Sequence, residues 1–434
     1  MGAPNYGSAA LNEVLMLETY NKEIDLLQNV EMALDKRFSD IKTTDASLRN
    51  FRIGEQTEMG TQVSAFNSDG GAYSPGLGNS FDQGQMTPFE IIGGAAFTDL
   101  ARRIGEGGSS VTIINPIERL MSDMTRKLSK KRNALLQGSN NGQLATVDAA
   151  YAGGGANPIT LSVDPFGARL IDLHETVQVF DHTTNLVRTT CFVTNQQSLG
   201  IGTGDSITVD AVPAGTVAGD YIMQLGVASG TPLFFNGLQY IVSPSQTGEY
   251  LGQSRALSYV QSPALNANSA PLTLGTVQAF LTRMMQPLGM STFESDRTKN
   301  FWYEHPAQWM AWVSLGFAEQ QVMLVGGAGA KNFDGVSSPF GNKKMADIDV
   351  ELDTVAAVSK VYFLDQSRLV RCRFSKAPQM VPGPIKGMYW PRIVGGAYTT
   401  ENDVYMYDAV NYASRNNWAN GVIYGLQIPG ALKV

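Results

Sequence analysis

The chain of 434 residues is long enough for two or three domains and for a sizeable hydrophobic core. Only 16% of its residues are charged, against about 25% in ordinary soluble domains, although 43% are hydrophobic and 45 are glycine. So little charge predicts a protein whose surface is largely covered by neighbours. The net charge of −7 argues against sequence-specific DNA binding and leaves room only for loose, non-specific contact with nucleic acid.

The N-terminal sequence and the cysteine content indicate the cellular compartment in which the protein is made and used. Residues 1–15 lack the basic-then-apolar order of a signal peptide, and Tyr6 stands where a myristoylation signal has Ser or Thr. No apolar run approaches the roughly 20 residues that cross a bilayer. Cys191 and Cys372 are too few for a disulfide framework and are expected to be reduced thiols in strands. We expect a protein made and used in a cytoplasm, with no membrane contact.

Residues 1–50 are predicted to form an N-terminal helical arm, with helix over residues 10–40. Apolar residues recur there at spacings of three and four, with Glu and Lys between them. A helix with this pattern buries its apolar face on its own body or on a neighbour. The face consists of Leu11, Val14, Leu15, Ile24, Leu27, Val30, Leu34 and Phe38.

Residues 51–113 are predicted to form an extended loop. Residues 67–86 hold five glycines and a proline, and the flanking segments 61–66 and 87–92 could pair as a two-stranded ribbon. A loop this long without its own core is usually disordered or functional. We interpret it as an arm that packs on another subunit, with a flexible surface loop as the alternative. The residues expected to make the contact are Gly70, Gly71, Tyr73, Pro75 and Phe81.

Residues 114–139 carry the clearest helix signal in the chain. Asn115 can cap the helix, Pro116 suits its first position, and Glu118 completes a capping box. Gly138 is the expected stop. About 22 residues give a rod of about 33 Å, which suits a helix lying across a sheet. Its predicted apolar face consists of Ile117, Leu120, Met121, Met124, Leu128 and Leu135.

The basic residues of this helix form the only dense basic cluster in the chain. They are Arg126, Lys127, Lys130, Lys131 and Arg132. Acidic residues come early in the helix and basic ones late, which matches the helix dipole. We therefore expect a solvated, dipole-matched end, with contact to an acidic neighbouring subunit as the alternative.

Residues 140–232 are predicted to form an inserted β-rich domain. Short β-branched runs alternate with turn sequences at intervals of roughly ten to fifteen residues, which is typical of a small β-barrel or sandwich. The expected strands lie at 159–163, 175–181, 187–194, 206–212 and 221–226.

Residues 233–395 are predicted to form a mixed α/β region. Helices are expected over 277–285 and 305–317, with Pro306 near the start of the second, and strands over 348–352, 357–365 and 369–374. Residues 396–434 are expected to form two long antiparallel strands, 404–412 and 422–429, joined near a turn at Asn420-Gly421.

Candidate catalytic or ligand-binding motifs are weak throughout. His174 and His182 have no cysteine or carboxylate cluster in sequence to complete a metal site, and His305 is expected to cap a helix. The Gly-rich segments 200–206 and 326–333 lack phosphate-loop spacing and are expected to be turns. Residues 252–256 resemble half of a nucleophile elbow without its second glycine. We therefore predict no enzyme activity, no cofactor and no metal.

The order of these parts resembles the major capsid proteins of tailed bacteriophages with the Hong Kong phage fold. The helical arm, the Gly-rich ribbon, the helix ending KKRNALLQG and the final strands follow in the same order. Several short segments also resemble the corresponding stretches of these capsid proteins. They are FFNGLQYIV, GEYLGQSRA, APLTLGTVQAFLTRM, FWYEHPAQWMAW, VYFLDQSRLVRCRF and NNWANGVIYGL. The resemblance covers most of the chain outside residues 140–232 and rests on the type and order of elements.

The resemblance implies an α+β capsid fold. Residues 114–139 would be the spine helix of a peripheral domain, 233–395 an axial domain with parts of the peripheral one, and 51–113 a loop over the next subunit. It further implies hexamers and pentamers in an icosahedral shell around double-stranded DNA, assembled in a host bacterial cytoplasm. A separate scaffold, a portal and possible decoration proteins would be partners.

Two departures from the family pattern change the expectation. The insert is not part of the minimal fold, although several phage lineages carry β-rich insertions. Residues 51–113 contain no lysine, so covalent crosslinking through that loop is not expected. The alternatives are an encapsulin-like shell or a phage tail protein, and, from another class, a hydrolase with a β-rich accessory domain.

Overall fold

The fold is given by a computed structural model. It describes residues 34–41, 51–58, 80–98, 116–197, 205–245, 247–257, 260–285, 299–323, 344–346, 348–373, 379–384, 390–394 and 397–429. Within them the fold is α+β, as predicted, with three six-stranded sheets and two smaller ribbons. Among the described helices, none is long and apolar enough to cross a membrane.

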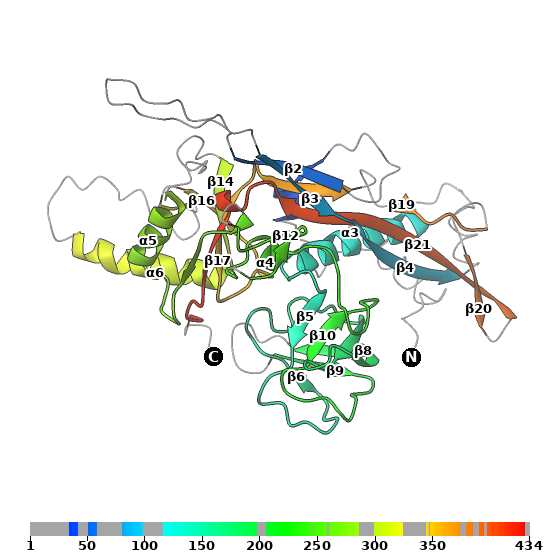
Figure 1. The fold of residues 1–434 in the computed structure, drawn as a ribbon. Helices are drawn as coiled ribbons and strands as arrows, with labels where there is room; N and C mark the ends of the chain where they lie inside the picture. The colour runs from blue at the N-terminus through cyan, green and yellow to red at the C-terminus, as the bar shows by residue number, and fades with distance from the viewer. Residues whose placement is uncertain are drawn as a thin grey trace, which may run out of the picture.

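The first sheet, here called the peripheral sheet, is built around the 18-residue strand β21 (Ala397–Ser414). The helix α3 (Pro116–Leu136) lies along it, so the chain has the expected long helix laid across a long sheet (Figure 1). The other strands of this sheet are β1 (Ser39–Asp40), β4 (Phe89–Thr98), β18 (Leu369–Arg373), β19 (Gln379–Met380) and β20 (Trp390–Val394).

The second sheet, here called the axial sheet, is covered by α5 (Leu274–Met285) and α6 (Pro306–Met323). Successive side chains of its strands point to opposite faces and enter two different cores. Trp302 packs with the α5 side chains, whereas its neighbour Tyr303 faces the core shared with α3. In spatial order the strands are β13 (Ala264–Asn266), β22 (Gly421–Tyr424), β17 (Val361–Asp365), β14 (Asn300–Glu304), β16 (Ile348–Leu352) and β15 (Lys344–Met345).

The inserted domain is a small antiparallel barrel. Six strands follow one another in space, and an isolated bridge between Val147 and Leu161 closes the ring. In that order they are β5 (Gln143–Thr146), β10 (Tyr221–Gln224), β7 (Thr176–Phe180), β8 (Val187–Gln197), β9 (Ser206–Val209) and β6 (Ile159–Thr160). The five predicted strands are confirmed, and β5 is the sixth that the sequence pattern missed.

A two-stranded ribbon is present, but its strands are not those predicted. β2 (Phe51–Glu58) pairs with β3 (Ser80–Met86), whereas residues 61–66 lie outside the described part of the chain. β4 leaves the ribbon and pairs with β21 over ten residues. The prediction that residues 87–92 pair within the ribbon is therefore wrong, because β4 lies against the long strand β21.

The predicted C-terminal hairpin is also wrong. β21 belongs to the peripheral sheet, whereas β22 has four residues and lies in the axial sheet, between β13 and β17. The short helix η4 (Asn417–Ala419) joins them. Gly421 serves close packing instead of a turn: a Cβ there would lie 2.6 Å from the Phe280 ring and 2.8 Å from the Met284 sulfur.

Two helix ends differ from the sequence prediction. The predicted arm helix does not reach residue 40, because the chain forms the short 3-10 helix η1 (Asp35–Arg37) and then β1; residues 1–33 lie outside the described part. α3 ends at Leu136, and Gly138 lies beyond it without the positive φ of a glycine stop.

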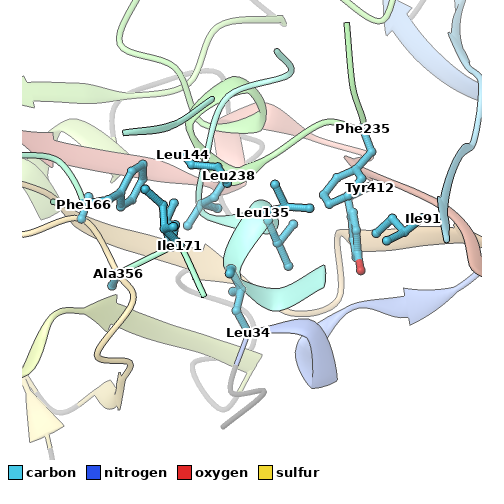
Figure 2. Packing of buried hydrophobic residues seen from close by; sticks show 14 of the residues in the cluster. Leu34, Ile91, Leu135, Leu144, Phe166, Ile171, Phe235, Leu238, Ala356 and Tyr412 are labelled. Atoms are coloured by element: carbon cyan, nitrogen blue, oxygen red, sulfur yellow. The ribbon is translucent and has the colours of Figure 1, made fainter. Parts of the chain in front are cut away.

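One hydrophobic core joins the parts. Leu34 of the N-terminal segment, Leu135 of α3 and Tyr412 of β21 pack in the same cluster as Ile171 of the barrel and Ala356 of the axial region (Figure 2). The remaining described elements border it and include α4 (Leu238–Ile241) and the hairpin of β11 (Glu249–Tyr250) and β12 (Gln253–Ser254).

Candidate assembly site

The spine helix meets the peripheral sheet through the apolar face that the sequence predicted. Met124 and Leu128 are buried against the sheet. The Leu128 side chain comes within 3.2 Å of the position that a Cβ of Gly93 would take, so the glycine in β4 permits this close approach. Glu118 and Leu120 lie in α3 as predicted, with side chains outside the described set, and Asn115 is not described.

A buried ionic network ties the N-terminal segment to the spine helix and the peripheral sheet. The carboxylate of Asp35 accepts hydrogen bonds from Arg132 at 2.5 Å, from Arg371 at 3.0 Å and from the Tyr412 hydroxyl at 2.6 Å. Asp408 accepts from Arg132 and, through both oxygens, from Arg373 at 2.8 Å. The network thus joins η1, α3, β18 and β21.

The electrostatics of this network favour the charged forms. Burial alone would raise the pKa of Asp35, but Arg132, Arg371 and the Tyr412 hydroxyl outweigh it, and the pKa lies below its usual value. For Arg132, burial opposes the charge, while Tyr412, Asp35 and Asp408 raise its pKa. Burial and Asp35 raise the pKa of Tyr412 well above 10, so its hydroxyl remains a donor.

The solvated-end interpretation of the basic cluster is therefore wrong for two of its members. Lys131 and Arg132 are 8% and 5% exposed, and the last turn of α3 carries no basic residue. Arg126 and Lys127 are exposed, as predicted. The acidic partners of Lys131 and Arg132 lie far away in sequence, so no local pattern could have indicated that these two side chains are buried.

The barrel is fixed to the spine helix by two ion pairs. Lys130 pairs with Asp172 at 2.6 Å, and Lys131 pairs with Glu175 at 2.7 Å while donating to the backbone oxygen of Leu170 at 3.0 Å. These residues of the barrel precede β7. Their contacts hold the insert beside the C-terminal half of α3.

The chain enters and leaves the barrel at neighbouring points. The Phe234 amide donates to the Asn140 oxygen at 2.6 Å, and the Gly237 amide donates to the Ser139 oxygen at 3.0 Å. A Cβ on Gly237 would collide with the backbone carbonyl of Gly138. The two ends of the insert are thus held together by hydrogen bonds and close packing, in addition to the ion pairs and core contacts of the barrel with α3.

The junction of β14 and α6 in the axial region holds two ionisable side chains whose pKa values are shifted by burial. His305 caps α6 as predicted, because its Nδ1 accepts the Ala307 amide at 3.1 Å. Burial and the nearby Arg169 lower the pKa of His305 to about 3, which keeps that nitrogen an acceptor. Glu304 is fully buried with no hydrogen-bond partner for either carboxyl oxygen, and burial raises its pKa to about 8.

The predicted contact residues of the extended loop are mostly outside the described chain. Gly70, Gly71, Tyr73 and Pro75 are not described, and Phe81 lies in β3 opposite Gln56, with its side chain outside the described set. The described base of the ribbon lies against the β11–β12 hairpin. There a Cβ of Gly84 would come within 3.2 Å of Leu251.

One group in the described residues has metal-ligand geometry, which the sequence analysis did not expect. Asp181 and Asp220 converge on His182, whose Nδ1 lies 3.0 Å from an Asp220 oxygen. Arg188 pairs with Asp181 at 2.9 Å and with Asp220 at 2.9 Å. The guanidinium thus already supplies positive charge to both carboxylates, which makes this group a structural ion pair cluster of the barrel.

The comparisons with known proteins bear on this architecture. No protein-family model matches the chain, and no curated protein matches its sequence. Among solved structures, a chain of the cyanophage A-1(L) capsid asymmetric unit has a TM-score of 0.52 over 94% of this chain and 97% of its own, at 13% identity. That likeness shows the fold: this chain has the tailed-phage capsid fold.

Two further structures are similar over most of the chain. A capsid chain of a native GTA particle has a TM-score of 0.44 at 9% identity, covering 93% of this chain and 92% of that one. The SrpI encapsulin of Synechococcus elongatus has a TM-score of 0.42 at 8% identity, with 95% of each chain covered.

Proposed function

We propose that this chain is the major capsid protein of a tailed bacteriophage, a structural subunit that assembles with copies of itself into an icosahedral shell. The observation that carries the proposal is the capsid fold, shared with a cyanophage capsid chain over nearly the whole length of both. The described chain has the spine helix on a long sheet, the ribbon and the axial sheet that the resemblance implies, together with the barrel.

Exposed apolar side chains support a role in assembly. At the far end of the peripheral sheet, Ile393 and Tyr398 are cross-strand partners and are 57% and 76% exposed. Trp390 on the same hairpin and Ile92 on β4 are also exposed. Apolar side chains gathered on an elongated sheet suit contact with neighbouring subunits, which would bury them.

The described polar groups favour a structural role over catalysis. The cluster at His182 is held by Arg188, the ionic network around Asp35 is internal, and Glu304 is enclosed in the axial core. None of them joins a nucleophile, a base and an open cleft, which acyl or phosphoryl transfer would require. We infer that the chain works by packing against copies of itself.

The finer parts of the proposal follow from the capsid assignment. The subunits would form hexamers and pentamers around double-stranded DNA, with assembly in the cytoplasm of a bacterial host. A separate scaffold, a portal and possible decoration proteins would be partners, and contact with the packaged DNA would be non-specific because the chain is acidic.

The first experiment is an assembly assay. The purified full-length protein is sedimented and imaged by negative-stain microscopy. We expect closed shells or rings of five and six subunits. A protein that remains monomeric over a wide range of concentration and ionic strength contradicts the proposal, and filaments favour a tail protein. Packaged cargo protein in place of DNA favours an encapsulin-like shell.

The ribbon has a separate test. Residues 59–79 are replaced by a short Gly-Ser turn, which keeps the described β2 and β3 strands and the packing of Gly84 on Leu251. The expected protein is folded, with an unchanged circular dichroism spectrum, and fails to form stable shells. Shells of normal yield and stability contradict the assignment of this segment to contact between subunits.

The barrel is proposed to strengthen contacts within a ring of subunits. Leu186 and Leu225 are 53% and 47% exposed on its surface. Leu186→Ser combined with Leu225→Ser removes this apolar surface, whereas deleting the whole insert would also remove Ile171 and Glu175 from their contacts with the body. We expect rings that dissociate more readily in the double variant, and rings as stable as those of the wild type refute this role.

A further inference from the structure

The peripheral and axial sheets are joined by three chain crossings that lie side by side. They run from β12 to β13, from β17 to β18 and from β21 to β22. The Arg415 amide donates to the Arg368 oxygen at 2.9 Å, and the Asn417 side chain donates to the Val260 oxygen at 2.8 Å. Crossings gathered at one place constrain the sheets like a hinge. Contacts away from them, the shared hydrophobic core among them, must therefore fix the angle between the sheets.

The segment Leu34–Ile41, here called the strap, is firmly bound to the peripheral side. Asp35 lies in the buried ionic network, and β1 pairs in parallel with β18. Leu34 and Phe38 are buried, with the Phe38 ring 4.9 Å from the Tyr412 ring. The strap therefore moves with the spine helix and the peripheral sheet.

The same strap contacts the axial side through Arg37. Its guanidinium pairs with Glu351 of β16 at 2.5 Å and lies 5.0 Å over the Phe301 ring of β14. It also donates to Gln366, in the crossing from β17 to β18, at 3.2 Å. A second tie, from Asn133 of α3 to Asp353 at 3.0 Å, is fully buried.

We propose that Arg37 is a positioning residue that sets the angle between the peripheral and axial sheets, and thereby the curvature of the assembled shell. The curvature rests on the proposed function, whereas the angle is a property of the single subunit. The Arg37 and Glu351 side chains are 35% and 29% exposed, so this tie can open to water while the buried network around Asp35 stays closed. Salt would weaken the exposed tie more than the buried one.

The test compares Arg37→Gln with Lys36→Gln, which removes the same charge from the exposed neighbour in the same short helix. Spin labels are attached through Ser122→Cys on α3 and Gln278→Cys on α5, both at exposed positions. Cys191 and Cys372 are buried, and burial raises their pKa values to about 11 and about 12, so they react poorly with the label.

In the unassembled protein, R37Q is expected to increase the population of a second label distance by about fivefold, the factor typical of a partly exposed ion pair. K36Q is expected to match the wild type. The double variant Arg37→Glu with Glu351→Arg restores the pair and should restore the single distance. A distribution that is unchanged in R37Q overturns the proposal.

Shell diameters measured by electron microscopy complete the test. R37Q is expected to give a broader or shifted diameter distribution, and K36Q and the charge-swapped variant that of the wild type. If the wild type forms no shells, the proposed function fails while the label distances still decide the role of Arg37. Altered distances with unchanged diameters overturn the link to curvature.

Discussion

The buried carboxylate of Asp35 allows the sharpest prediction about stability. Asp35→Asn keeps the size of the side chain and removes the charge that faces Arg132, Arg371 and the Tyr412 hydroxyl. Removing one partner of a buried pair costs about 3–5 kcal/mol. Arg132 keeps Asp408 as a partner, so we expect the low end, a loss of about 3 kcal/mol of unfolding free energy.

The measurement is urea unfolding of the unassembled protein, followed by circular dichroism. The matched control is Asp40→Asn, which removes the other carboxylate of Arg371, an exposed one 2.7 Å away. That variant is expected to lose less than about 1 kcal/mol. Equal losses in D35N and D40N would show that the buried network does not stabilise the fold as described.

The same network predicts a dependence on pH. Because the folded-state pKa of Asp35 is below its ordinary value, its stabilising contribution is present at pH values above about 4 and is lost as the pH falls through the folded pKa. The difference in stability between the wild type and D35N should therefore be constant from pH 5 to 7 and shrink below pH 4. A difference that grows in acid contradicts the lowered pKa.

Three further predictions test other parts of the structure. Burial raises the pKa of Glu304 to about 8, so the unfolding free energy of the wild type should fall as the pH rises from 4.5 to 8. Glu304→Gln should remove this fall, which amounts to roughly 4 kcal/mol at pH 8 and is measured by urea unfolding at each pH. Gly237→Ala should lower the melting temperature strongly because its Cβ meets a backbone carbonyl. Gly275→Ala should not, because its Cβ would meet only the Thr273 hydroxyl, at an ordinary contact distance of 3.8 Å. Lys131→Met should cost about 2 kcal/mol and expose the two ends of the insert to limited proteolysis, whereas the exposed Lys127→Met should behave like the wild type; equal behaviour of the two lysine variants would contradict the anchoring of the barrel.

Local sequence patterns predicted the elements that depend on local chemistry. Pro116 begins α3, Met124 and Leu128 face the sheet, and His305 caps α6. The five strands of the barrel were recognisable from β-branched runs between turns. In each case the signal lies within a few residues of the element that it specifies.

The predictions that failed concern partners distant in sequence. Arg132 looked solvent-exposed because its partners, Asp35 and Asp408, lie 97 and 276 residues away. Asn420-Gly421 looked like a hairpin turn, but Gly421 is required by the contact with α5, and the strands on either side belong to different sheets. The pattern of a turn does not reveal which sheet the next strand joins.

The metal-like cluster of the barrel shows the same limit. Asp181, His182 and Arg188 lie close together in sequence on one hairpin, but Asp220 reaches them only because β10 pairs with β7. Sequence spacing could not reveal this second carboxylate.

The most direct test of the central claim is a cryo-electron microscopy reconstruction of particles formed by the purified full-length protein. The account predicts closed icosahedral shells built from rings of five and six subunits, with each β2–β3 ribbon lying over a neighbouring subunit. It also predicts that the Ile393 and Tyr398 hairpin is covered by neighbouring subunits. Particles without five-fold and six-fold rings, or a protein that stays monomeric, would contradict it.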